Sequence, residues 1–263
     1  MFIKAKKSLG QNFLVDKDVI NTIIKCSLIK GREILEVGPG TGSLTEKIIE
    51  NKPSKIYLIE KDKYLLEQLR KKLNYNIQFF NKDILKINEK KLSKNTLTVF
   101  GNLPYNISTE ILIRWIINLK SKIWFDKLIL MFQKEVAQRI ISKHNTPYYG
   151  RLSVISNWKL DIEKIIDIKP NSFRPRPKVD SSLLVFTPKT NFKKICSEES
   201  LEKVTRIFFN QRRKKIKKPF RQLFDNPDGV AKKLSIDLDL RPQNLTTDTY
   251  LFIAKEYDNL IRS

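Results

Sequence analysis

Short apolar runs alternate with amphipathic segments through the first part of the chain. In the segment after the first run, Leu44, Ile48 and Ile49 recur on one helical face. Four apolar runs have the length and composition of buried strands: 33–37, 55–60, 77–80 and 96–100. Strands that alternate with helices predict an α/β domain of Rossmann-like topology.

Capping signals and composition predict further elements in this region. Asp16 and Ser108 are each expected to cap a helix, the second over 109–117, because their side chains can accept hydrogen bonds from free backbone N–H groups. The other predicted helices are 64–73 and 133–141, and the other predicted strands are 127–132, 154–160 and 181–186.

Composition changes near residues 187–194, and the chain beyond is predicted to be helical. The expected helices cover 201–224, with a break or kink at Pro219, and then 229–234 and 246–261. We therefore expect two domains, a Rossmann-like domain over 1–188 and a small all-helical C-terminal domain over 189–263.

The 263-residue chain is strongly basic. It has 51 Lys and Arg residues against 28 Asp and Glu, a formal net charge of +23 at pH 7. This excess favours a polyanionic partner, either nucleic acid or a membrane surface, although a proteome-wide preference for lysine would explain part of it. No hydrophobic run approaches a membrane span and no signal-peptide pattern opens the chain, so no membrane partner is expected.

Cysteine and histidine are scarce. Cys26 and Cys196 lie far apart, which fits a reducing cytoplasm and argues against a disulfide framework. His144 stands alone among turn-forming residues, so neither a metal site nor a Ser-His-Asp triad is expected. These observations predict a cytoplasmic protein without a metal.

A glycine-rich turn, Glu-Val-Gly-Pro-Gly-Thr-Gly over 36–42, follows the first strand. Gly38 and Gly40 would let the backbone approach a ligand where a Cβ would clash. The second strand ends in Glu60, about 20 residues further on, where an acidic residue binds the ribose hydroxyls of an adenosine cofactor. The spacing is not G-x-G-x-x-G, which disfavours a pyrophosphate cradle. The structural alternatives are a plain tight turn and a surface glutamate.

Two further strand ends carry polar side chains. Asp83 follows the third strand and can accept a hydrogen bond from a cofactor's adenine amine, although read alone it is a turn residue. The fourth strand ends in Asn-Leu-Pro-Tyr over 102–105. Ligands of such sheets bind at the carboxyl ends of the strands, which favours one common site. The lysines and amides of 4–12 suggest a loop that closes over it, against the alternative of a disordered terminus.

The Asn-Leu-Pro-Tyr stretch suits the methylation of an exocyclic base amine. The lone pair of an adenine amine is delocalised into the ring, so the nitrogen is a poor nucleophile. Asn102 and Leu103 can offer carbonyl oxygens to its two N–H bonds, because Pro104 keeps Leu103 out of the helical conformation. Tyr105 can stack on the base. The structural alternative is an ordinary strand-to-helix connection.

Two basic segments are candidate RNA-binding sites. In a proline-stiffened loop, Arg174, Arg176 and Lys178 can hold phosphates. Phe173 in the same loop either covers the second face of an extruded base or plugs the core, and the sequence favours neither. No acidic residue interrupts 204–224, a basic stretch better explained by a phosphate backbone than by a solvated face. It includes Arg212, Arg213, Lys214 and Lys215.

Seven motifs span nearly the whole chain: LGQNFL (9–14), EVGPGTG (36–42), GNLPYNIS (101–108), QKEV (133–136), YGRLSV (149–154), PKVDS (177–181) and FNQRRK (209–214). Together they resemble the KsgA/RsmA family of ribosomal RNA adenine dimethyltransferases. The resemblance implies a Rossmann-like domain that binds S-adenosyl-L-methionine and a small helical domain. It also implies dimethylation of N6 on two adjacent adenosines in the hairpin loop near the 3′ end of 16S rRNA.

By motif, the resemblance implies roles for individual residues. The cofactor-binding residues would be Asn12, Leu14, Gly38, Gly40, Glu60, Asp83 and Asn102. The target amine would be lined by Asn102, Leu103, Pro104 and Tyr105, with Phe173 stacking. The implied partner is 16S rRNA in the small (30S) subunit or its precursor, with a monomeric enzyme and a role in subunit biogenesis.

Three rival functions are open. A sister group methylates one adenosine of large-subunit rRNA and gives antibiotic resistance, but YGRLSV and FNQRRK favour the small subunit. A non-catalytic RNA-binding assembly factor is disfavoured by the intact Asn-Leu-Pro-Tyr stretch and glycine turn. A nicotinamide-dependent oxidoreductase is disfavoured by the glycine spacing and the basic helix.

Overall fold

The computed structural model describes residues 5–6, 9–119, 123–192 and 197–262, and their contacts divide the chain into two compact units. The first consists of Met1–Ala137 and Asp161–Pro188, and the second of Gln138–Leu160 and Lys189–Ser263. The sequence places 138–160 in the first domain. The structure corrects this, because Tyr149, Val154 and Trp158 pack into the core of the second unit.

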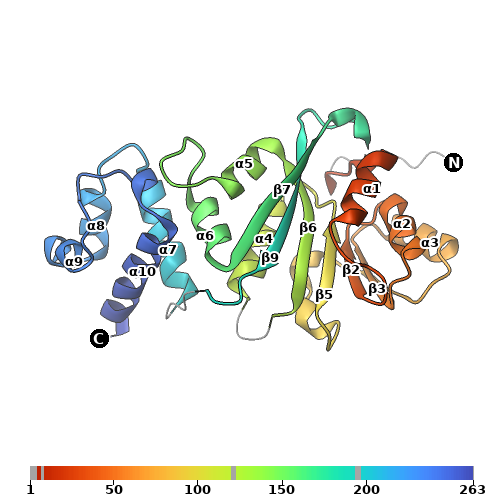
Figure 1. The fold of residues 1–263 in the computed structure, drawn as a ribbon, viewed down its shortest axis with the longest axis horizontal. Coiled ribbons are helices and arrows are strands. Elements are labelled where there is room, and N and C mark those ends of the chain that lie inside the picture. Colours follow the sequence, from red (N-terminus) through yellow and green to blue (C-terminus); the bar gives the residue numbers. More distant parts are fainter. Residues whose placement is uncertain (1–4, 7–8, 120–122, 193–196, 263) are drawn as a thin grey trace. The chain divides into compact units, whose positions relative to one another are not determined.

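The first unit is built on a seven-stranded sheet (Figure 1). The strands, in spatial order, are β4 (Ile77–Asn81), β3 (Lys55–Glu60), β2 (Glu33–Val37), β5 (Leu97–Gly101), β6 (Phe125–Gln133), β9 (Ser181–Pro188) and β7 (Leu160–Ile168). The first five strands in this order pair in parallel, and β9 pairs antiparallel with β6. The carboxyl ends of β2, β3 and β5 therefore meet at one edge, where ligands of parallel sheets bind.

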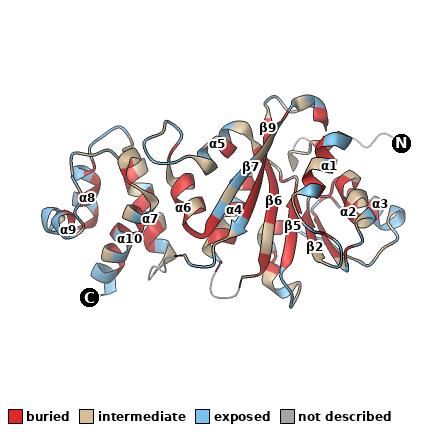
Figure 2. Ribbon diagram, in the orientation of Figure 1, coloured by how far each residue is buried: buried red, intermediate tan, exposed pale blue. Residues whose placement is uncertain are grey.

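Burial explains why these apolar runs form strands. Figure 2 shows buried residues along most of the sheet, and Ile34, Leu58 and Val99 have no exposed surface. The helices of this unit are α1 (Lys17–Lys25), α2 (Ser43–Glu50), α3 (Lys63–Lys72), α4 (Ser108–Ile117) and α5 (Lys134–Ile141), whose last residues belong to the second unit. Short 3₁₀ turns are η2 (Ile84–Lys86), η3 (Glu89–Lys91) and η4 (Pro170–Ser172).

One of the two predicted helix caps is confirmed. The carboxylate of Asp16 accepts hydrogen bonds from the backbone N–H groups of Asp18 and Val19 at the start of α1. The prediction for Ser108 is wrong: it is the first residue of α4, the cap position belongs to Ile107, and the Ser108 hydroxyl donates to the carbonyl oxygen of Tyr105 at 3.2 Å.

The predicted strand over 154–160 is also wrong, because α6 (Arg151–Lys159) occupies it and β7 begins only at Leu160. The backbone N–H of Gly150 donates to the Ser153 hydroxyl at 3.0 Å and holds the start of α6. Small and apolar residues are buried on several sides of this helix, so its sequence lacks the polar face that would reveal a helical period.

The second unit is helical. Its helices are α6, α7 (Glu198–Phe209), α8 (Lys217–Leu223), α9 (Pro227–Lys233) and α10 (Thr247–Arg262), with a short 3₁₀ turn, η5 (Pro242–Asn244). The sequence predicts one helix over 201–224 that breaks at Pro219. The break instead covers 210–216, and Pro219 lies in the first turn of α8, where its missing N–H is not needed.

Two very short strands tie the N-terminal segment to a distant loop. Strand β1 (Phe13–Leu14) pairs antiparallel with β8 (Phe173–Arg174). Among the described residues, no helix combines the length and apolar character needed to cross a bilayer.

Candidate active site

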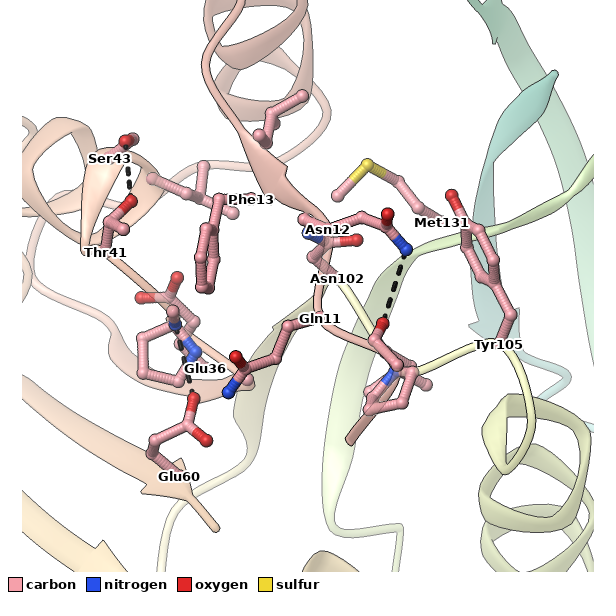
Figure 3. Close-up of a pocket in the computed structure, with 18 residues that line it drawn as sticks. Gln11, Asn12, Phe13, Glu36, Thr41, Ser43, Glu60, Asn102, Tyr105 and Met131 are labelled. Carbon is pink, nitrogen blue, oxygen red and sulfur yellow. Dashed lines mark hydrogen bonds between the residues drawn. The ribbon is translucent and has the colours of Figure 1, made fainter. Parts of the chain in front are cut away.

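An open cavity lies at the carboxyl ends of β2, β3 and β5 (Figure 3). Figure 3 shows Glu60 on one side of the cavity and Tyr105 with Met131 on the other. Most of the predicted catalytic and cofactor-binding residues line it: Asn12, Leu14, Gly38, Gly40, Glu60, Asn102, Leu103, Pro104 and Tyr105.

The glycine turn forms the floor beside β2. Gly38 and Gly40 have φ values of +71° and +58°, which favour glycine. A Cβ on Gly38 would lie 3.2 Å from the Asn102 carbonyl oxygen, and one on Gly40 would lie 2.8 Å from the ring of Phe13. The turn therefore needs glycine both for its conformation and for its closeness to the neighbouring segments.

Glu60 ends β3 with its carboxylate inside the cavity, and only 7% of its surface is exposed. Its two oxygens accept hydrogen bonds from the backbone N–H groups of Asp62 at 2.9 Å and Gly40 at 3.3 Å. Burial raises the pKa of this carboxyl group. These backbone donors fix the carboxylate at the end of β3 inside the cavity, and its binding to ribose hydroxyls stays a prediction.

Glu36 also lines the cavity, although it is not among the site residues predicted from the sequence. It is almost fully buried in β2, and its carboxyl group accepts a hydrogen bond from the Thr45 hydroxyl at 2.7 Å. Burial raises its pKa to about 8. The sequence did carry a signal for this residue, a carboxylate within the strand EILEV, two residues before Gly38.

Asp83 lines a second cavity, which shares Gly38 and Pro104 with the first. Its carboxylate accepts hydrogen bonds from the Lys61 ammonium at 2.8 Å and the Leu85 backbone N–H at 3.0 Å. The bond from Lys61 is the main reason that its pKa is lowered. The apolar lining consists of Leu9, Val37, Ile59, Ile84 and Ile107.

The N-terminal segment lies against both cavities. Leu9 lines the second cavity, and residues 10–14 line the first. Lys6 and Gln11 bind the buried carboxylate of Asp62 at 3.0 and 3.1 Å, which anchors this segment beside the end of β3. Leu14 is buried in the core, whereas the Asn12 backbone carbonyl contacts Asn102, just after the end of β5.

The side-chain amide of Asn102 has a defined orientation. Its nitrogen Nδ2 donates to the Asn12 carbonyl oxygen at 2.7 Å, and a carbonyl can only accept. The amide oxygen Oδ1 must therefore point the other way. Among the described residues, none donates a hydrogen bond to this oxygen or to the Leu103 carbonyl oxygen. Within the described residues both oxygens therefore lack a protein donor, and their role as acceptors for the target amine stays a prediction.

Phe173 requires a correction. Its side chain has no exposed surface and packs in the core with Leu14 and Ile168, because β8 pairs with β1. The expectation that it stacks on a base is not supported, and the core-plug alternative holds. The other residues predicted in this loop, Arg174, Arg176 and Lys178, are exposed.

The basic segment of the second unit lies between α7 and α8, and most of its cations are exposed. Arg213, Lys214 and Lys215 are exposed, and Lys215 forms an ion pair of 2.9 Å with Asp239. Arg212 is half-buried and donates a hydrogen bond to the Pro147 carbonyl oxygen, so part of its guanidinium already holds a loop of its own unit. Within the described ranges, no three His, Cys, Asp or Glu side chains gather closely enough to hold a metal ion.

A mostly parallel sheet whose strand ends carry a glycine turn, a buried acid and an Asn-Leu-Pro-Tyr segment is typical of a Rossmann-like methyltransferase. The chain belongs to the ribosomal RNA adenine dimethylase family, whose sequence profile matches residues 2–259. The predicted family, the fold class and the activity of an rRNA adenine dimethyltransferase are confirmed. The large-subunit, non-catalytic and oxidoreductase alternatives are not favoured.

Individual relatives agree with this family. The chain is 58% identical over 260 residues to "Ribosomal RNA small subunit methyltransferase A" of Pelagibacter ubique (strain HTCC1062), with 99% of each chain covered. It is 35% identical to the protein of the same name from Wolbachia sp. subsp. Drosophila simulans (strain wRi), with 98% and 95% covered.

Two solved structures share the fold. A dimethyladenosine transferase from Plasmodium falciparum has a TM-score of 0.79 at 24% identity and covers 94% of this chain and 98% of its own. The 23S rRNA methyltransferase ErmE has a TM-score of 0.69 at 21% identity and covers 94% and 100%.

Proposed function

We propose that the protein transfers methyl groups from S-adenosyl-L-methionine to N6 of two adjacent adenosines in the hairpin loop near the 3′ end of 16S rRNA. The substrate would be the small subunit or its precursor, and the enzyme would act as a monomer in the cytoplasm. The names of the relatives and the family membership support the substrate class. The observation that carries the chemistry is the orientation of the Asn102 amide by the Asn12 carbonyl.

The two cavities suit S-adenosyl-L-methionine. Glu60 would accept hydrogen bonds from the ribose hydroxyls, and Asp83 would accept one from the adenine amine between apolar side chains. Gly38 and Gly40 leave space where a Cβ would collide with neighbouring atoms. Once bound, the cofactor supplies a methyl group on a positively charged sulfur.

The residues after β5 would hold the target amine. Asn102 Oδ1 and the Leu103 carbonyl oxygen would accept hydrogen bonds from its two N–H groups. Tyr105 would stack on the adenine ring. This arrangement would orient the nitrogen lone pair toward the methyl group, which is the entropic part of catalysis. As the nitrogen–carbon bond forms and the sulfur–carbon bond breaks, the nitrogen becomes acidic and loses its proton to solvent. No strong protein base is required.

Exposed cations would hold the RNA. In the first unit they are Arg174, Arg176 and Lys178, and in the second unit Arg213, Lys214 and Lys215. Such contacts position the RNA backbone without reading its sequence. Arg212 would contribute less, because it already donates to Pro147.

The test is methyl transfer from labelled S-adenosyl-L-methionine to small subunits that lack this modification, followed by mass spectrometry of the RNA fragments. We expect dimethyladenosine at two adjacent positions near the 3′ end of 16S rRNA. Label on large-subunit RNA would instead assign the protein to the resistance-type group. Tight RNA binding without any label would support the assembly-factor alternative.

A further inference from the structure

The hydroxyl groups of Tyr105 and Ser181 form a hydrogen bond of 2.5 Å within the first unit. The two residues are 76 positions apart in the sequence: Tyr105 follows β5, and Ser181 is the first residue of β9. Ser181 has no exposed surface, so solvent does not compete for its hydroxyl. Tyr105 lines the cavity and is half-buried.

The sheet fixes the position of Ser181. It pairs with Gln133 of β6 in the antiparallel register. The preceding residue, Asp180, accepts the Lys134 backbone N–H at 2.9 Å through its carbonyl and binds the Lys169 ammonium at 2.8 Å through its carboxylate. The Ser181 hydroxyl therefore extends from an anchored strand start.

The backbone of the tyrosine is held as well. The buried Ser108 hydroxyl donates to the Tyr105 carbonyl oxygen at 3.2 Å. With its carbonyl and its phenol both bound, Tyr105 keeps one ring orientation beside the cavity. A ring that is already oriented loses little rotamer entropy when a base arrives, and small errors in its position would be costly to the reaction.

We propose that Ser181 is a positioning residue for methyl transfer: its hydroxyl holds the Tyr105 ring in the orientation that stacks on the target adenine. The inference rests on the function proposed for this cavity. Ser181 acts only through Tyr105 and touches neither base nor cofactor. Removing either hydroxyl should therefore have the same consequence, and removing both should add nothing further.

A double-mutant cycle tests this coupling. Ser181→Ala and Tyr105→Phe each remove one hydroxyl and keep the aromatic ring. We expect each to slow single-turnover methyl transfer roughly fivefold to tenfold at saturating RNA and cofactor, the effect of about one net hydrogen bond. The dissociation constants for RNA and cofactor should change less than about twofold. The double variant should be no slower than the slower single variant.

Ser182→Ala is the matched control, because Ser182 is equally buried in the same strand but its hydroxyl binds Asp167 at 2.7 Å. It should methylate at nearly the wild-type rate at a temperature where thermal unfolding shows every variant folded. A wild-type rate for Ser181→Ala would overturn the positioning role. So would a double variant whose loss equals the product of the two single losses.

A second measurement does not depend on the reaction. If the wild-type protein methylates no ribosomal RNA, the proposed function fails, and the coupling is then read by NMR of protein with ¹³C-labelled tyrosine rings. The Tyr105 signal, assigned as the one missing in Tyr105→Phe, should shift in Ser181→Ala and stay in place in Ser182→Ala. An unmoved signal in Ser181→Ala would overturn the inference.

Discussion

Replacing Asn102 by alanine removes the oriented amide at the end of β5. In the folded protein its nitrogen is 2.7 Å from the Asn12 carbonyl oxygen, so the amide oxygen is held in place before the substrate binds. Loss of one such preorganised dipole typically costs about 10²–10³-fold in rate, or about 2.7–4 kcal/mol of transition-state stabilisation. We expect a loss of this size in the chemical step.

The effect on stability should be much smaller. The variant loses one hydrogen bond between half-buried groups, worth about 1 kcal/mol, which corresponds to a decrease in Tm of roughly 2–4 °C for a chain of this size. Asn102→Asp is a sharper test of orientation, because it has nearly the same shape. Its second oxygen would face the Asn12 carbonyl oxygen with no proton between them, so it should be as slow as the alanine variant.

The assay is single-turnover methyl transfer with both RNA and cofactor saturating, together with calorimetric binding of each. Asn74→Ala, which removes an exposed asparagine from the first unit, is the control and should behave as wild type. A rate for Asn102→Ala within about threefold of wild type would refute the role of this amide in holding the target amine.

Three further predictions concern other groups. Glu60→Gln should weaken cofactor binding more than RNA binding, because a neutral amide accepts hydrogen bonds from ribose hydroxyls less strongly than a carboxylate does. Equal losses of affinity for the two ligands by calorimetry would contradict the ribose role. Changing Arg213 and Lys214 together to Gln should reduce the salt dependence of RNA binding by about two units of slope, and an unchanged slope would make this segment a solvated face. Because burial raises the folded-state pKa of Glu36 to about 8, this group should lower the free energy of unfolding as pH rises from about 5 to 8, by at most about 1.4 kcal/mol per pH unit. Urea titrations should show that Glu36→Gln lacks this decrease, and a pH-independent difference from wild type would argue against a protonated Glu36.

Most elements of the first unit could be predicted because their signals are local. Apolar runs that end in Gly38, Glu60 or Asn102 identify buried strands with polar ends, and a parallel sheet brings such ends together. The helix α6 was missed because residues buried on several sides leave no periodic polar face. Its membership in the second unit depends on packing partners beyond residue 200, which no local pattern reveals.

The sequence by itself determined the family, through its motifs. It also determined the alternation of strands and helices and the residue types at each strand end, because these features are encoded in short local segments of the chain. Only the tertiary structure decided how these residues face one another. The pairing of β8 with β1 buries Phe173. A hydrogen bond to the Asn12 carbonyl oxygen orients the Asn102 amide, and another links the hydroxyls of Tyr105 and Ser181. Each of these contacts joins residues more than 70 positions apart, and their geometry is set by the folding of the whole sheet.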